Sequence, residues 1–113
     1  MFATIHIGDK DVGMLANAAS PYIFKQVFHE DLLQKFTQMQ RDPDNNIGEK
    51  LGFIFSKQAE TSDVTELMKL NMNDFLNWVA EFEPLDVFLA SEQIVALYQS
   101  QKKGTSAPKK QGE

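Results

Sequence analysis

The stretch IGEKLGFIFSKQA, residues Ile47–Ala59, decides the fold of this chain. Its apolar residues recur at intervals of three and four, which places them on one face of a helix. They are Ile47, Leu51, Ile54 and Phe55. Gly48 and Gly52 lie four residues apart in the same helix, where each costs roughly 1 kcal/mol relative to alanine. We therefore expect these two glycines to let the backbone of another element approach closely.

The N-terminal residues predict a β-hairpin. Residues 2–7 alternate two sets of side chains and are rich in β-branched types, which is typical of a short strand. Residues 8–11 have turn chemistry, and Val12–Asn17 can return as a second strand. Because a lone hairpin is only marginally stable in water, this one must pack against the helices.

Helical segments connect the hairpin to the central helix. Ser20 is placed to cap a helix, and Pro21 suits its first position, where the missing N–H is no loss. Apolar residues keep helical spacing as far as Met39. Proline and the Asx residues within 41–46 then end the helical stretch.

After the central helix the pattern weakens and then returns. Residues 60–74 have no consistent period and predict a short helix plus a loop. Asn73 and Asp74 can cap the next helix, which we expect to end at Pro84. Its apolar stripe consists of Phe75, Leu76, Val79 and Phe82, with Trp78 at the border.

The last helix is expected to begin at Ser91, after an apolar bridge over residues 85–89. Residues 102–113 contain no large apolar side chain and should be a disordered basic tail. The sequence thus predicts one globular domain over residues 1–101. Its fold class is α+β, mainly α, with an N-terminal β-hairpin packed on a bundle of four to five short helices.

Composition and charge limit the function classes. The 113 residues suit one domain, and the absence of cysteine fits a reducing, cytoplasmic compartment. Four lysines and one glutamate give residues 102–113 a net charge of +3, so with −5 overall the rest of the chain carries −8. Such an acidic body disfavours nucleic acid as a partner. The start of the chain lacks the features of a secretory signal, and no apolar stretch is long enough to span a membrane.

Each catalytic or metal-binding motif that we tested fails at a specific residue. Gly8 and Gly13 have the spacing of a phosphate-binding loop, but apolar residues follow where lysine and a hydroxyl are needed. Asp42, Asp44 and Asn46 resemble the first ligands of a calcium loop, yet its sixth and twelfth positions are isoleucine and phenylalanine. These regions predict a hairpin turn and a helix-breaking loop.

The two histidines are far apart in sequence. His6 lies in a predicted strand, and His29 lies at a helix end, where a cation is favoured electrostatically. We therefore expect no catalytic residue, cofactor or metal site, and a protein that is not an enzyme.

Met68, Leu70 and Met72 fall in the segment without a helical period and are candidates for an exposed apolar patch. Together with Trp78, they form the predicted partner-binding surface.

Three stretches, in order, resemble a known family. The first is Asn17–Pro21 followed by Phe28–Leu33, the second is Leu51–Ala59, and the third is Phe75–Trp78 with Phe82–Asp86 and a final Leu97-Tyr98 pair. They are similar to an Ala-Ala-Thr-Pro helix entry, a Lys-Gln-Ala helix end and a Trp-Leu-x-x-Phe-Glu module. This combination resembles the tail assembly chaperones of long-tailed bacteriophages, particularly phages and prophages of Gram-positive bacteria. His29 and Glu30 depart from the small and basic residues usual there.

The resemblance implies a non-structural assembly factor in the cytoplasm of the bacterial host. It would bind the tape measure protein, keep it soluble before the tail tube forms, and be absent from the mature virion. The tail tube protein and a second copy of the chain are further candidate partners. Programmed frameshifting near Lys102-Lys103 or Lys109-Lys110 would yield a longer form. The alternatives are a structural virion component, such as a head–tail connector or minor tail protein, then an acidic regulatory module, and last an enzyme.

Overall fold

A two-residue turn at Gly8-Asp9 brings the first two strands together. In the computed structural model, which describes residues 2–39 and 47–106, β1 (Phe2–Ile7) pairs antiparallel with β2 (Lys10–Leu15), so that Ile5 lies opposite Val12. Gly8 adopts a φ of 65°, a left-handed conformation that glycine tolerates best. The predicted hairpin is confirmed. Its second strand begins two residues earlier than expected, because the turn uses only two residues, and it ends at Leu15.

Six helices follow the hairpin in the described ranges. They are α1 (Ser20–Phe28), α2 (Leu32–Met39), α3 (Ile47–Glu60), α4 (Val64–Leu67), α5 (Met72–Val79) and α6 (Asp86–Ser106). The predicted α+β, mainly α class is confirmed. The expected four to five short helices become six, and α6 is a long helix of 21 residues.

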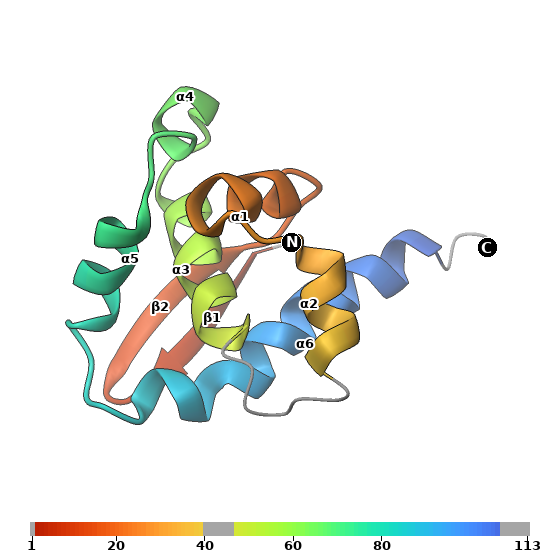
Figure 1. Cartoon of the computed structure of the whole chain (residues 1–113). Coiled ribbons are helices and arrows are strands. Elements are labelled where there is room, and N and C mark those ends of the chain that lie inside the picture. The colour runs from red at the N-terminus through yellow and green to blue at the C-terminus, as the bar shows by residue number, and fades with distance from the viewer. Residues whose placement is uncertain (1, 40–46, 107–113) are drawn as a thin grey trace.

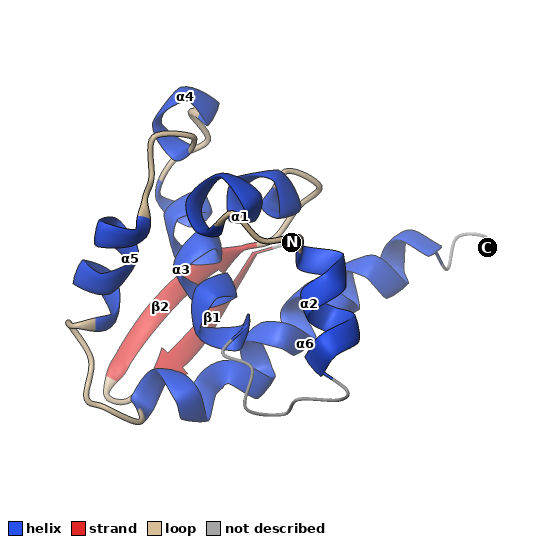
Figure 2. Cartoon of the chain, in the orientation of Figure 1, coloured by secondary structure: helices blue, strands red, loops and turns tan. Residues whose placement is uncertain are grey.

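The central helix predicted from Ile47 is α3, and it organises the packing. It contacts β2, α6, α1 and α5, while α6 also packs on β1 (Figures 1 and 2). A Cβ built on Gly48 would lie 2.8 Å from the backbone Cα of Ser91 in α6, and one on Gly52 would lie 2.9 Å from the Ile94 side chain. The expected close approach of another backbone is confirmed for Gly48 and is wrong for Gly52, whose nearest neighbours are the side chains of Ile94, Trp78 and Met14.

Ser20 does not cap α1. The residue before the helix is Ala19, and Ser20 itself is fully buried at the start of α1. Its hydroxyl donates a hydrogen bond to Oε1 of buried Gln58 in α3 at 2.7 Å, and the Gln58 amide donates to Oδ1 of Asn17 at 2.8 Å. The loop before α1 is thereby fixed to α3 by satisfied buried polar groups.

The helical stretch expected to reach Met39 is divided into α1 and α2. His29, at the end of α1, adopts a φ of 58° and its N–H donates to the Lys25 carbonyl at 2.8 Å, which ends the helix. Asp31 then accepts hydrogen bonds from the N–H groups of Leu33 and Gln34 at the start of α2. The predicted loop over residues 41–46 lies outside the described residues.

The caps of α4 and α5 differ from the prediction. Asp63 caps α4 by accepting from the Thr65 N–H. For α5 the cap is Asn71, which forms a reciprocal capping box with Asp74, so the expected cap at Asn73 and Asp74 is two to three residues too late. The helix ends at Val79, well before Pro84.

The prediction that the last helix begins at Ser91 is wrong. α6 starts at Asp86, directly after the turn that contains Pro84 and Leu85, and residues 86–89 of the expected bridge are its first residues. Ser91 lies inside the helix, where its hydroxyl donates to the Val87 carbonyl at 3.2 Å. The expected boundary of the tail at Lys102 falls within α6, and residues 107–113 lie outside the described residues.

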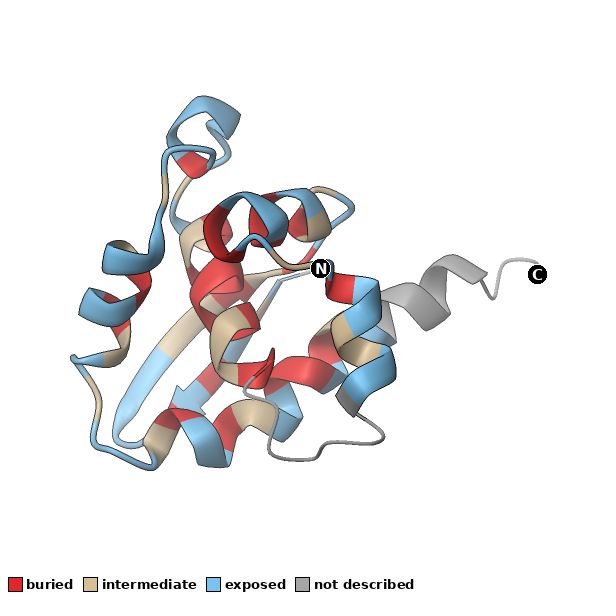
Figure 3. Cartoon of the chain, in the orientation of Figure 1, coloured by how far each residue is buried: buried red, intermediate tan, exposed pale blue. Residues whose placement is uncertain are grey.

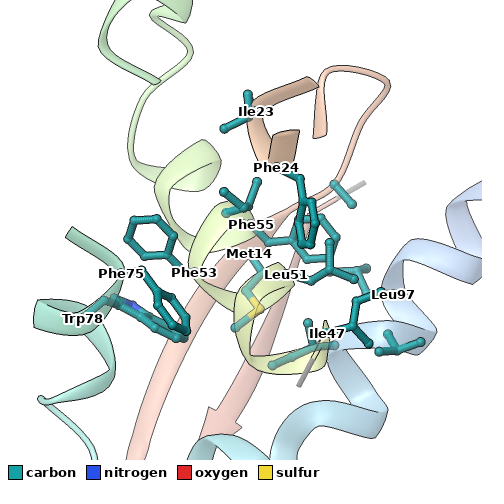
Figure 4. Close-up of a cluster of buried hydrophobic side chains, with 14 of the residues drawn as sticks. Met14, Ile23, Phe24, Ile47, Leu51, Phe53, Phe55, Phe75, Trp78 and Leu97 are labelled. Atoms are coloured by element: carbon teal, nitrogen blue, oxygen red, sulfur yellow. The ribbon is translucent and has the colours of Figure 1, made fainter. Parts of the chain in front are cut away.

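Most of α3 is buried (Figure 3), and an aromatic cluster lies beside it in the core (Figure 4). Phe53 is fully buried, with its ring centroid 5.7 Å from that of Phe75 and 6.0 Å from that of Trp78, both in edge-to-face orientation. Phe28 closes the cluster from α1, 5.1 Å from Phe75. These ring contacts join α1 and α5 to the central helix α3.

Candidate functional site

The four residues of the predicted partner-binding surface do not form one exposed surface, because they differ in burial. Met68 at the end of α4 and Met72 at the start of α5 are 37% and 43% exposed. Leu70, between them, is partly buried against the core. The partner-binding role of these three residues stays a prediction.

Trp78 belongs to the core and not to an exposed patch. Its side chain is 6% exposed and contacts the rings of Phe53 and Phe82, the latter at 5.0 Å. Gly52 makes room for it, because a Cβ there would lie 3.3 Å from the indole. A residue buried in this way cannot form the centre of an exposed surface.

Two further exposed apolar groups were not predicted. Leu76 in α5 is 53% exposed and lies four residues after Met72, so the two share the outer face of the helix. Leu85, directly before α6, and Phe88 and Leu89, in its first turn, are 64%, 55% and 70% exposed. Their spacing of three and four was the available signal, but the expected helix start at Ser91 placed them in an irregular bridge.

An open groove lies between the hairpin, α3 and α5. Its volume is about 380 Å³, and its walls include Phe2, Gly13, Ala59, Trp78 and Phe82. Lys10 also lines the groove, where its Nζ donates to the Glu81 carbonyl at 2.9 Å and lies 5.0 Å from the centre of the Phe82 ring. This lysine is therefore held by the fold.

The residues of the candidate catalytic motifs lie far from one another or have structural roles. Gly8 and Gly13 belong to the hairpin, as expected. His6 pairs across the hairpin with Asp11, whereas His29 ends α1. Within residues 2–39 and 47–106, no group of three His, Asp or Glu residues could hold a metal ion. The calcium-loop candidates Asp42, Asp44 and Asn46 lie outside the described residues.

Glu30 joins the α1–α2 junction to α3. Its carboxylate lies 2.7 Å from Nζ of Lys50 and 3.1 Å from Nζ of Lys35. Partial burial by itself raises the pKa of Glu30, but the hydrogen bonds and charges of Lys50 and Lys35 outweigh it, so this pKa lies below its ordinary value.

Replacing Glu30 with glutamine should reduce the loss of folding stability that occurs as the pH falls. Because the folded-state pKa of Glu30 lies below the unfolded value of about 4.3, the carboxylate stabilises the fold above that value, and this is lost as the pH falls through the folded pKa. At neutral pH, Glu30→Gln should therefore be less stable by roughly 0.5–1 kcal/mol, and the difference should shrink near pH 3. Urea denaturation at both pH values measures this.

The matched control is Glu66→Gln. Glu66 forms an exposed pair with Lys69 at 3.7 Å, so its removal should change stability little at either pH. An unchanged pH dependence in Glu30→Gln would show that the Glu30 cluster does not contribute to stability.

Comparisons with protein-family models, with curated proteins and with solved structures find no match to this chain. No helix in the described part of the chain is long and apolar enough to cross a membrane.

Proposed function

We propose that this protein is a tail assembly chaperone of a long-tailed bacteriophage, which binds the tape measure protein and keeps it soluble until the tail tube forms around it. It would act in the cytoplasm of the bacterial host and be absent from the finished virion. The resemblance of three ordered sequence stretches motivates this proposal.

The observation that carries the proposal is exposed apolar surface on an acidic body. α5 and the start of α6 present apolar side chains at helical spacing to solvent. Apolar groups at this spacing suit the apolar stripe of a partner helix, which would otherwise aggregate. The charge of −8 on residues 1–101 keeps such a body soluble and repels other copies of it.

Co-expression tests the proposal. A tape measure segment that is insoluble alone should become soluble, and copurify, when this protein is present. An unrelated acidic protein of similar size is the control, because charge alone should not rescue solubility. If the soluble fraction of the segment does not change, the chaperone function is excluded.

The composition of purified particles provides a second test. If the chain is a chaperone, mass spectrometry should not detect it in purified particles. A head–tail connector or minor tail protein would instead be found there at a fixed ratio to the tail proteins. Finding the chain there at such a ratio would favour a structural virion component.

A further inference from the structure

The start of α6 presents an apolar stripe to solvent. Leu85 directly precedes α6, and its carbonyl accepts a hydrogen bond from the Leu89 N–H at 2.9 Å. With Phe88 and Leu89 it therefore lies on one side of the first turn, each more than half exposed. The opposite side of the same turns is buried: Val87 and Ala90 are each 4% exposed and Ile94 is fully buried. The core therefore holds α6 in place and leaves the stripe uncovered.

This stripe differs from the other exposed apolar residues. Tyr22 and Leu33 are exposed singly on different helices, and isolated exposed apolar residues are common in proteins. Val64 and Met68 at α4, and Met72 and Leu76 on α5, are exposed only as pairs four residues apart. At the start of α6, by contrast, three large side chains lie within five consecutive residues, one directly before the helix and two in its first turn. Such clustering is typical of an interaction surface.

The charges beside the stripe indicate the chemistry of its occupant. Residues 81–99 include four acidic residues and no lysine or arginine. The acidic residues are Glu81, Glu83, Asp86 and Glu92. The nearby Lys10 donates to the Glu81 carbonyl and lies over Phe82, so it is already engaged by the fold. The stripe thus suits a partner whose apolar residues are flanked by basic ones.

The same charges argue against a second copy as the occupant. In a twofold dimer each copy would present the same patch, which would bring two sets of carboxylates together. Like charges facing each other are unfavourable at an interface.

We propose that the apolar face at the N-terminal end of α6, formed by Leu85, Phe88 and Leu89, is the docking site for an amphipathic helix with lysine or arginine beside its apolar stripe. This inference deepens the proposed function, and it rests on that function only for the natural partner, the tape measure protein.

A designed peptide pair tests the chemistry directly. One peptide of about 18 residues, or five helical turns, carries a leucine stripe flanked by lysine, and its twin carries the same stripe flanked by glutamate. Fluorescence anisotropy with the full chain should show binding of the lysine peptide, weakened by salt, and at least roughly tenfold weaker binding of the glutamate twin. Equal binding of the twins would overturn the proposed charge complementarity.

Matched variants locate the surface. Phe88→Ser combined with Leu89→Ser should weaken binding of the lysine peptide by roughly tenfold or more, while Leu33→Ser, at a leucine 61% exposed on α2, should not. Circular dichroism checks that all variants fold. Unchanged binding by the double variant overturns the site. A concentration-dependent dimer in sedimentation, lost in the double variant, would overturn the choice of occupant in favour of a second copy.

The outcomes separate this inference from the proposed function. If the wild-type chain binds the lysine peptide at this face but does not solubilise the tape measure segment, the function fails and the docking site stands. If both the wild-type chain and the double variant solubilise that segment, the function stands and the docking site fails.

Discussion

Replacement of Gly48 by alanine is expected to lower the free energy of unfolding by about 2 kcal/mol. The new Cβ would lie 2.4 Å from Cβ and 2.8 Å from Cα of Ser91, so α3 and α6 would have to separate. The sign of this change distinguishes the two cases, because glycine-to-alanine replacement in an uncrowded helix raises the free energy of unfolding by about 1 kcal/mol. Urea denaturation monitored by circular dichroism measures the difference, and the melting temperature should fall by roughly 10 °C.

Two variants control for this result. Gly13→Ala should be tolerated, because the nearest atom to its new Cβ, at 3.0 Å, is the tip of the exposed Phe2 ring, which can move aside. Ser91→Gly removes the closest atoms to residue 48, so the Gly48→Ala penalty should be smaller in that background, which a double-mutant cycle measures. A Gly48→Ala protein as stable as the wild type would contradict the close packing of α3 on α6.

Short-range sequence patterns predicted those helices and strands whose positions depend mainly on residues close to them in sequence. The periodic spacing after Ile47 gave the position of α3, and the alternation in residues 2–7 gave β1. Gly48 also gave a correct tertiary expectation, since glycine inside a helix is costly unless close packing requires it, whereas Gly52 makes room for side chains and not for a backbone.

The start of α6 was missed because serine has two common roles in helices. The expected helix begins at Ser91, but within a helix a serine hydroxyl can bond to a carbonyl four residues back, as it does to Val87. The apolar stripe of the proposed docking site was consequently hidden in a predicted bridge. Leu85 and Phe88 at helical spacing were the signal that could have revealed it.

Trp78 was misplaced because its burial depends on distant residues. Its own helix puts it at the border of an apolar stripe, and only the gap left by Gly52, with Phe53 beside it, encloses the indole. Such contacts between separate helices leave no periodic signal in either segment.

Two of the stretches that carry the family resemblance contact each other in the structure. Ser20, in the helix entry, donates a hydrogen bond to Gln58 at the end of α3, and Gln58 donates one to Asn17. Ser20 and Gln58 are buried, and their polar groups are satisfied by each other and by Asn17, which accounts for them as supports of the fold. Surface residues, and not these motifs, therefore carry the functional part of the proposal.

Phe53→Ala should have the largest effect of any single change considered, a loss of about 3–5 kcal/mol. Phe53 is fully buried, and its ring contacts those of Phe28, Phe75 and Trp78, so truncation leaves a cavity where three helices meet. Because a domain of this size is stable by only about 5–15 kcal/mol, the variant should be largely or partly unfolded at moderate temperature. The chain contains one tryptophan, so the fluorescence of Trp78 reports directly on this cluster.

Phe88→Ala is the matched control, since it removes the same ring from a position that is 55% exposed on α6. Its stability should stay within about 0.5 kcal/mol of the wild type, with unchanged Trp78 emission. The pair separates two roles of phenylalanine in one chain: Phe53 should be needed for folding, and Phe88 for binding the lysine peptide. A Phe53→Ala protein with wild-type stability and emission would contradict the packed cluster, whereas a destabilised Phe88→Ala protein would show that α6 needs its outer face to fold.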